Sequence, residues 1–295
     1  MSILIRNGRM IDPASRFDGQ RDILIEDAEI SRIAERIDFA ADTVIDAAGM
    51  IVLPGLVDLH VHFREPGGEH KETIFGGCAS AAKGGFTSVF PMPNTNPPVE
   101  SAELVRFTLA EGAKSGINVF PVAAISKRRA GEELVDMKEL MDAGAAAFSD
   151  DGSPVSNSLL MREALEAARD LGAIILAHEE DTALAHGGCI NEGAVSAKLG
   201  VRGIPRESEE VMIARDVILA KLAGGQLHIQ HTSSGGSVDI IREAKKRGIR
   251  VTCETGPPYF SLTEDAVLQH GAMAKMNPPL CTEADRRAVI EGLRD

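Results

Sequence analysis

Short apolar runs alternate with helix-like segments from Pro54 onward. The segments between the runs have helical periodicity, and several end in a glycine just before the next run, as a helix C-cap does. Strand and helix alternating in this way predict parallel βα units. We therefore expect an α/β fold, namely a (β/α)₈ barrel of the TIM type with seven of its eight strands present. The predicted strands lie in residues 56–62, 87–93, 118–125, 145–151, 173–180, 226–233 and 250–257.

Residues 1–53 follow a different rhythm. Short β-like pieces such as ILIRNG and DILIEDAEI are punctuated by the turn dipeptides Asn7-Gly8 and Asp18-Gly19. This pattern predicts a small N-terminal module of the β-sandwich kind. The change of rhythm divides the chain into a β module over 1–53 and a barrel domain over 54–295.

Composition argues against several classes of protein. The formal net charge of −13 disfavours binding to nucleic acid, and the lack of Trp with a single Tyr leaves little aromatic surface for stacking bases. No apolar run approaches the roughly 18 residues that span a bilayer, and the N-terminus is too charged for a signal peptide. The four cysteines lack CxxC spacing, which indicates reduced thiols. We expect a cytoplasmic protein without membrane or nucleic-acid partners.

Polar residues stand at the ends of the predicted strands, where the catalytic groups of a parallel barrel gather. Because strand side chains alternate, His60 and His62 point the same way, and two converging imidazoles suit a divalent metal. His228 and His231 are three apart and face opposite sides, so we favour His231, which is nearer the strand end. The resulting candidates are His60, His62, Asp150 or Asp151, His178 and His231.

Each of these residues also has an ordinary structural interpretation. A single histidine after an apolar run is more often a hydrogen-bonded core residue, and Asp-Asp-Gly is a common turn. Scattered cysteines are more often small core residues than zinc ligands. The succession of HxH, Asp and two single histidines at consecutive strand ends nevertheless indicates a metal centre.

The motifs of the chain resemble those of dihydroorotases of the bacterial class, within the amidohydrolase superfamily. HxH alone would give only the superfamily, whereas HFREPG together with PMPNTNP is more specific. The resemblance covers the whole chain. It implies an enzyme of pyrimidine biosynthesis that interconverts N-carbamoyl-L-aspartate and L-dihydroorotate by attack of a metal-bridging hydroxide on the ring amide. The motifs are DLHVHFREPG, PMPNTNPP, FSDDG, AHEED, QHTSS and KMNPPL.

The resemblance also implies a site with two zinc ions. His60 and His62 would bind one ion, and His178 and His231 the other. Asp151, directly before Gly152, would bridge the ions at the place where many relatives have a carbamylated lysine.

The same resemblance assigns residues to the substrate. Arg64 and Asn94 match the residues that hold its carboxylate, and Asn277 matches a further substrate contact. A guanidinium suits this role because it binds a carboxylate through two parallel hydrogen bonds. Cys281 departs from the family pattern, since arginine is expected after NPPL.

Parts of the expected enzyme lie outside this sequence. The family's catalytic Asp, which also completes the first zinc site, follows an eighth strand that would come after Asp295. The second half of the β module is also expected there. We therefore expect this chain alone to be unable to turn over its small anionic substrate. We expect a homodimer or a complex with another enzyme of the pyrimidine pathway.

Two alternatives stay open. A hydantoinase or allantoinase would share the fold and HxH, but generally has lysine where Asp151 stands. A non-catalytic homologue could serve as a scaffold for an enzyme such as aspartate transcarbamoylase. Such homologues usually lose metal ligands, whereas five of the six are kept here. A substrate panel tests the first alternative, and metal analysis tests the second.

Overall fold

The computed structural model describes residues 1–295, which divide into two compact units, Met1–Leu56 and Val57–Asp295. This division falls close to the boundary expected between residues 53 and 54. None of the helices combines the length and the apolar character needed to cross a bilayer.

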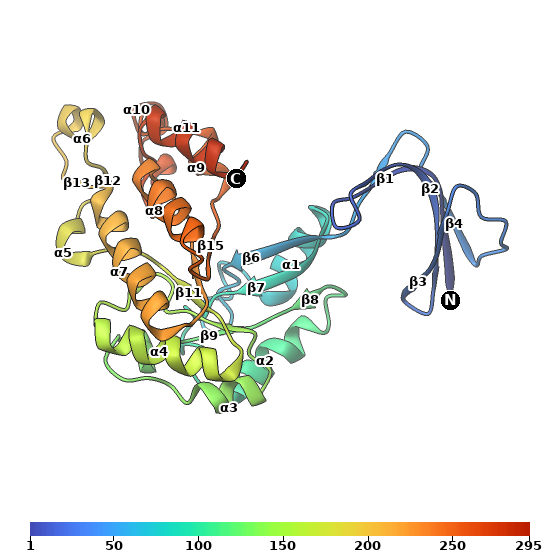
Figure 1. Cartoon of the computed structure of the whole chain (residues 1–295), viewed down its shortest axis with the longest axis horizontal. Coiled ribbons are helices and arrows are strands. Elements are labelled where there is room, and N and C mark those ends of the chain that lie inside the picture. Colours follow the sequence, from blue (N-terminus) through green and yellow to red (C-terminus); the bar gives the residue numbers. More distant parts are fainter. The chain divides into compact units, whose positions relative to one another are not determined.

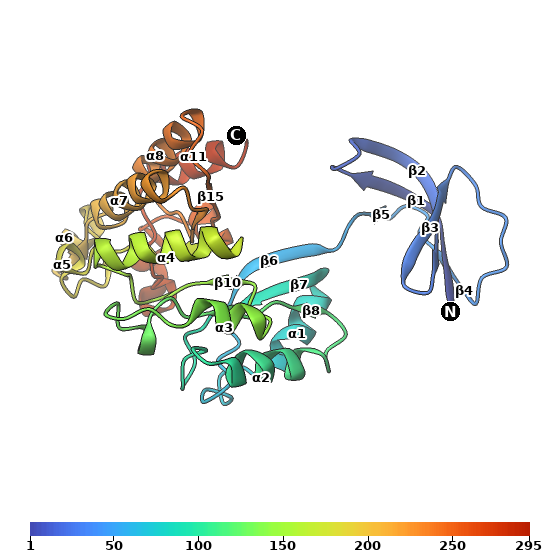
Figure 2. The same ribbon diagram turned by 60° about the horizontal axis from the view of Figure 1, so that its bottom comes forward.

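The N-terminal unit is a single five-stranded sheet with the order β3-β2-β1-β4, in which β5 also pairs with β1. β1 and β2 are antiparallel, whereas β4 and β5 run parallel to β1. Leu4, Leu24 and Ile37 form its small core. The β content fits the predicted module, although residues 1–56 supply one sheet rather than two packed layers (Figure 2). The strands are β1 (Ser2–Asp12), β2 (Phe17–Glu26), β3 (Glu29–Ala34), β4 (Thr43–Asp46) and β5 (Ile51–Val52).

The second unit is an α/β fold whose main strands follow chain order in two sheets, β6-β7-β8 and β9-β10-β11-β14-β15. The pairs within the larger sheet are parallel, as the alternation of strand and helix predicts. Each of the seven predicted runs contains at least one strand. The strands are β6 (Leu56–Val61), β7 (Phe86–Pro91), β8 (Asn118–Val119), β9 (Val122–Ala123), β10 (Ala147–Phe148), β11 (Ile175–Ala177), β14 (Leu227–Ile229) and β15 (Val251–Cys253).

The third predicted strand is split in two. Phe120 and Pro121 interrupt the run 118–125, so β8 belongs to one sheet and β9 to the other. Proline has no N–H to continue a ladder of hydrogen bonds, which accounts for the break. The sheet pairing therefore shows two open sheets and no closed barrel.

Helices follow most of the strands (Figure 1). Several begin where the side chain of a Ser, Thr or Asn accepts a hydrogen bond from the first turn, as at Thr73, Asn157 and Ser234. The helices are α1 (Ile74–Lys83), α2 (Ala102–Gly112), α3 (Met137–Asp142), α4 (Ser158–Leu171), α5 (Thr182–Ala185), α6 (Ala194–Leu199), α7 (Glu207–Ala223), α8 (Gly235–Lys246), α9 (Pro257–Ser261), α10 (Ala266–His270) and α11 (Glu283–Gly292). A short parallel pair, β12 (Ile190–Asn191) and β13 (Gly203–Ile204), lies between α5 and α7.

The main core lies between the larger sheet and its helices. Phe148, Ile175, Leu227 and Ile229 are fully buried in it. These residues come from β10, β11 and β14. Their burial fixes these three strands in place, and the residues that follow the strands include Asp151, His178 and His231, three of the five candidate metal ligands.

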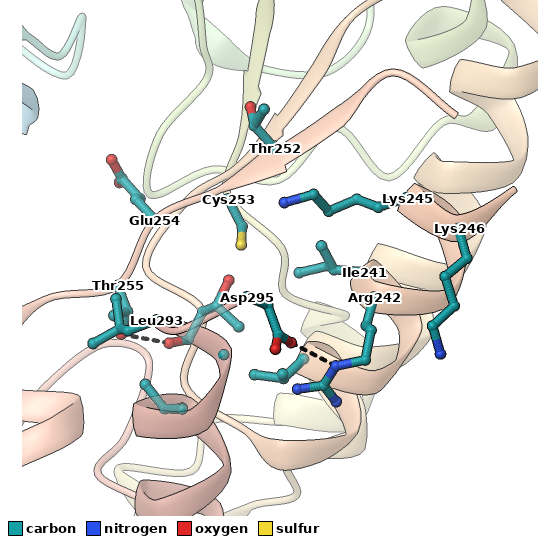
Figure 3. Close-up of a pocket in the computed structure, with 14 residues that line it drawn as sticks. Ile241, Arg242, Lys245, Lys246, Thr252, Cys253, Glu254, Thr255, Leu293 and Asp295 are labelled. Atoms are coloured by element: carbon teal, nitrogen blue, oxygen red, sulfur yellow. Dashed lines mark hydrogen bonds and ion pairs between the residues drawn. The ribbon is translucent and has the colours of Figure 1, made fainter. Parts of the chain in front are cut away.

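A cleft of about 600 Å³ opens beside β15, at one end of the larger sheet (Figure 3). Apolar and basic side chains of α8 form one wall, and α11 contributes to another. The lining includes Ile241, Arg242, Lys245, Thr252, Cys253, Glu254 and Leu293.

Candidate metal centre

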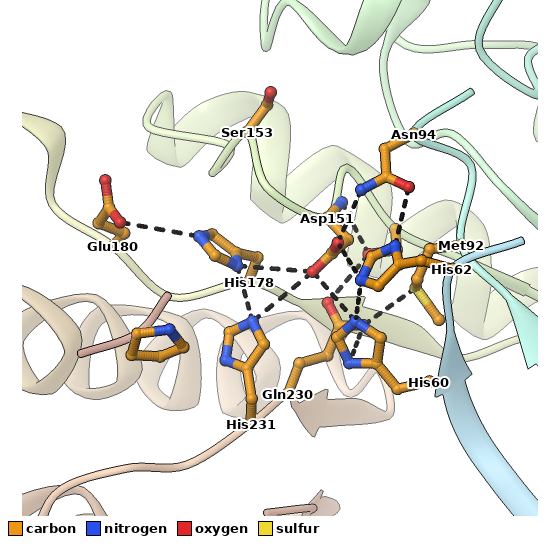
Figure 4. Close-up of polar contacts among 12 residues, drawn as sticks. His60, His62, Met92, Asn94, Asp151, Ser153, His178, Glu180, Gln230 and His231 are labelled. Atoms are coloured by element: carbon orange, nitrogen blue, oxygen red, sulfur yellow. Dashed lines mark hydrogen bonds and ion pairs between the residues drawn. The ribbon is translucent and has the colours of Figure 1, made fainter. Parts of the chain in front are cut away.

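The five metal ligands predicted from the sequence lie together at the C-terminal ends of the strands (Figure 4). The potential ligand atoms of His60, His62 and Asp151 lie within 4.8 Å of one another, and so do those of Asp151, His178 and His231. Asp151 belongs to both groups. The structure thus places one carboxylate between two histidine pairs.

The first group has the spacing of atoms that share one ion. The Nε2 atoms of His60 and His62 are 3.2 Å apart, and they lie 3.4 and 3.5 Å from the two carboxylate oxygens of Asp151. Two ligand atoms bound to the same tetrahedral zinc ion are about 3.4 Å apart, given a bond length of about 2.1 Å. Nitrogen and oxygen donors at this spacing fit a zinc-like ion.

The second group is similar but tighter. His178 Nδ1 and His231 Nε2 lie 3.5 and 3.6 Å from Asp151 Oδ1, and are 2.7 Å from each other. The distance between these two nitrogens is that of a hydrogen bond. His231 Nδ1 is buried without a partner. Both rings therefore direct a nitrogen at the shared carboxylate.

Asp150 and Asp151 face opposite directions. The carboxylate of Asp150 accepts hydrogen bonds from the backbone N–H groups of Ile125 and Ser126, at 2.9 and 3.1 Å, and from the Ser126 hydroxyl. It is therefore tied to the chain after β9. The two carboxylates follow β10 and leave the chain in different directions, so only Asp151 reaches the histidines.

Charge in the centre favours metal binding at Asp151 and His231, but not at His60 and His178, whose pKa values the neighbouring carboxylates raise, against the effect of burial, to about 10 and about 9. Burial alone would raise the pKa of Asp151, but hydrogen bonds from His178, His231 and His60 hold that pKa well below its usual range. Burial lowers the pKa of His231 to about 4, against the opposing effect of Asp151. An ionised carboxylate and a neutral imidazole are the forms that bind metals.

Comparison with known proteins identifies the family. A family model described as Dihydro-orotase-like matches residues 49–237. A dihydroorotase from Pelotomaculum thermopropionicum is 48% identical over 295 residues, covering all of this chain and 69% of the relative. One from Syntrophus aciditrophicus is 51% identical over 298 residues and is covered to 70%. The chain belongs to the dihydroorotase family. This places it among the hydrolases that act on cyclic amides.

Solved structures of hydantoinases share the fold of this chain. L-hydantoinase (dihydropyrimidinase) from Arthrobacter aurescens superposes with a TM-score of 0.85 at 25% identity, over 99% of this chain and 66% of its own. Dihydropyrimidinase from Brevibacillus agri NCHU1002 gives 0.81 at 23% identity, with the same coverage. The chain thus spans slightly less than two thirds of these structures. The higher identity to dihydroorotases favours that family over the hydantoinases.

The predicted substrate residues surround the centre in different ways. Asn94 donates from Nδ2 to Asp151 Oδ2 at 3.1 Å, and its Oδ1 lies 3.0 Å from His62 Nδ1. Asn94 thus contacts two predicted metal ligands, a role that the sequence did not indicate. Arg64 has a positive φ of 60° and pairs with no carboxylate. Its charge helps to lower the pKa of His62, after the larger effect of burial.

Asn277 lies near Glu180, beside the second group. Glu180 Oε2 is 3.9 Å from His178 Nε2, and the proximity of His178, then that of Asn277, lowers the pKa of Glu180. Asn277 thus lies near Glu180, which is itself next to the second group. Its predicted contact with substrate stays a prediction.

Two residues near the centre were not predicted from the sequence. Glu254 follows β15 and places Oε1 2.5 Å from His60 Nδ1. Glu254 could have been found from the sequence, because it lies near the end of the seventh predicted strand, and the other candidates were chosen as polar residues at strand ends. Arg129, in the loop after β9, donates from Nη2 to the Asp151 carbonyl at 2.8 Å and to Ser153 Oγ at 2.9 Å. No spacing rule points to a residue in such a loop.

Cys281, the departure from the dihydroorotase pattern, is buried and belongs to neither ligand group. Its Sγ lies 3.8 Å from Ser233 Oγ and donates to the Pro279 carbonyl at 3.5 Å. Burial raises the pKa of the thiol far above its ordinary value. The thiol acts here as a small packing group, and none of the four cysteines belongs to the two ligand groups.

Proposed function

We propose that this chain carries the metal centre and the substrate contacts of a dihydroorotase, which interconverts N-carbamoyl-L-aspartate and L-dihydroorotate. The observation that supports this proposal is Asp151 lying between two histidine pairs in a chain 48–51% identical to dihydroorotases. In this proposal His60 and His62 hold one zinc ion, His178 and His231 hold a second, and Asp151 contacts both. When bound, such ions act as Lewis acids towards an amide carbonyl and lower the pKa of a coordinated water.

The substrate carboxylate would be bound by Arg64 and Asn94. Arg64 has no carboxylate partner in the protein, so its guanidinium is free to form a bidentate pair with an anion. The amide nitrogen of Asn94 carries two hydrogens, and its contact with Asp151 uses one of them. The second hydrogen would then point a donor at the substrate, beside the ligands that Asn94 orients. Asn277 would contact the substrate from the side of His178.

We also propose that the two sheets are parts of one (β/α)₈ barrel. The strands follow one another in chain order, and β15 and β6 lie at the open ends of their sheets. An eighth strand would pair with both of them, next to the cleft beside β15. The carboxylate that protonates the leaving nitrogen would come from the end of this strand, as the resemblance implies.

Metal analysis tests the proposed centre. The purified chain should bind two zinc ions at neutral pH, and His178→Ala should lower this content. His186→Ala is a matched control, because His186 belongs to neither ligand group. Zinc content near zero in the wild-type chain, or unchanged in His178→Ala, would contradict the assignment.

A substrate assay tests the activity. The chain alone should hydrolyse dihydroorotate slowly or not at all. Co-expression with the part of the Pelotomaculum thermopropionicum relative that this chain does not match should raise the rate by at least ~10²-fold, the scale of a missing general acid. Hydantoin and dihydrouracil serve as competing substrates. A preference for hydantoin would assign the chain to the hydantoinases instead.

A further inference from the structure

The two ring nitrogens of His60 have different partners. Nε2 faces His62 and Asp151, as a metal ligand would. Nδ1 lies 2.5 Å from Oε1 of Glu254, a carboxylate from the end of β15. Glu254 thus contacts the side of the ring that points away from the proposed metal.

Glu254 is itself held by a second histidine. Its Oε2 lies 3.4 Å from His228 Nε2, and His228 Nδ1 lies 2.8 Å from the hydroxyl of Thr252. His228 is buried within β14, with 4% of its surface exposed. A continuous series of polar contacts therefore connects Thr252, His228, Glu254 and His60.

We propose that Glu254 is a positioning residue, which fixes His60 with Nε2 towards the metal, and that His228 holds Glu254 in place. This inference rests on the proposed zinc function. A carboxylate that accepts the Nδ1–H of an imidazole fixes its tautomer and orientation and strengthens the opposite nitrogen as a ligand. Gln230 Nε2 also lies 3.3 Å from His60 Nδ1, but an amide nitrogen is a donor and cannot accept that proton.

The other proposed ligands lack this support. His62 Nδ1 has the neutral amide oxygen of Asn94 at 3.0 Å. His178 Nε2 is 3.9 Å from Glu180, beyond hydrogen-bond distance, and His231 Nδ1 is buried without a partner. Glu254 Oε1 also accepts the backbone N–H of His231 at 3.4 Å, but this contact leaves the His231 ring without a carboxylate partner. The effect of Glu254 on a ligand ring should therefore be confined to the first group, which holds His60.

Zinc titration of the whole chain tests the inference. Glu254→Gln keeps the size of the side chain but should weaken zinc binding at the first group by roughly 10–100-fold. Affinity at the second group should stay unchanged, and titrations of His60→Ala and His178→Ala assign the two affinities. Glu180→Gln is the matched control, since it removes a nearby carboxylate that contacts no ligand of the first group. Loading with Co²⁺ should show a shift in the visible spectrum of the first group only.

The outcomes separate the inference from the proposed function. A wild-type chain that binds no zinc would overturn the function. Zinc binding that is equal in the wild type and in Glu254→Gln would overturn the inference alone. Equal weakening of both groups would also overturn it, because that result indicates general structural damage. If Glu254→Gln does not fold, His228→Gln replaces it, and a several-fold loss confined to the first group is then expected.

Discussion

At the scale of single residues, the direction in which a side chain points decides its role as much as its chemical type does. Asp150 and Asp151 are chemically alike and adjacent, yet one is bonded to the chain after β9 and the other faces four histidines. The same carboxylate is thus a structural acceptor at one position and a candidate metal ligand at the next.

Exchange of these two carboxylates for amides should separate their roles. Asp151→Asn should abolish most zinc binding, because the bridging charge is lost. Asp150→Asn should keep its zinc but destabilise the fold by about 1–3 kcal/mol, the cost of leaving buried donors poorly satisfied. Metal content and urea unfolding measure the two effects. A larger loss of zinc in Asp150→Asn would reverse the assignment.

Removal of the Arg64 charge should affect anionic ligands only. Arg64→Met should weaken binding of dihydroorotate to the zinc-loaded chain by roughly 2–4 kcal/mol, the scale for losing a charge-assisted partner. Uncharged dihydrouracil should bind as before, and Arg162→Met, on the exposed face of α4, is the control. Calorimetry with both ligands makes the comparison. Equal weakening for both ligands would argue against a carboxylate contact.

The sequence was sufficient to predict site residues that are close together along the chain or that lie at the ends of strands. His60 and His62 follow from spacing alone, and the family motif selected Asp151. The contacts of Asn94 with His62 and Asp151, and of Arg129 with the Asp151 carbonyl, depend on how separate loops meet. Such contacts are set by tertiary packing and leave no periodic signal.

At the scale of elements, the start of α11 connects three parts of the second unit. Asp285 accepts hydrogen bonds from the N–H of Thr282 at 3.2 Å and from the N–H of Gly235, at the start of α8, at 3.0 Å. Arg206, just before α7, lies 3.2 Å from the same carboxylate. A single side chain therefore caps one helix and joins it to two others.

Asp285→Asn should reduce stability in a pH-dependent way. Despite the opposing effect of burial, bonds from Thr282, Gly235 and Arg206 lower the pKa of Asp285 in the folded state. Its contribution is therefore present above the unfolded-state pKa of about 4 and is lost as the pH falls through the lower folded value. We expect a deficit of about 1–2 kcal/mol at pH 7 that shrinks in acid. Urea unfolding at several pH values measures it, with exposed Glu291→Gln as the control.

The order of strands and helices was predictable, but the length of the strands was not. The run 118–125 looks continuous in its apolar pattern, and only the structure shows that Pro121 divides it between two sheets. The parallel pair β12 and β13 lies in a segment without alternation and was not foreseen. Two-residue strands are fixed by their neighbours, because so short a segment has no period of its own.

At the scale of the whole molecule, the strands at the open ends of the two sheets, β6 and β15, have an unpaired edge. β6 and β15 each pair on one side only, and Val57 and Leu59 of β6 are 54% and 38% exposed. A strand with free N–H and C=O groups and exposed apolar side chains can pair with another chain. Such pairing would produce either a dimer or aggregation.

We expect the chain to associate as its concentration rises. Val57→Lys should reduce this association, because a charge on an edge strand opposes pairing. Sedimentation velocity over a range of concentrations measures it, and Val211→Lys, on the exposed side of α7, is the control. Association that persists in Val57→Lys and disappears in Val211→Lys would place the interface on the helices instead.

The contact between His60 and Glu254 also has a consequence in time, since the two residues are 194 positions apart. At translation rates of about 5–20 residues per second, roughly 10–40 seconds separate their synthesis. During that interval His60 and His62 are already present on the ribosome, but the carboxylate that would orient His60 does not yet exist. Zinc that arrives early meets a ring free to rotate and to change tautomer. If Glu254 positions His60 as proposed, the histidine pair made first would be the last to become competent to bind metal.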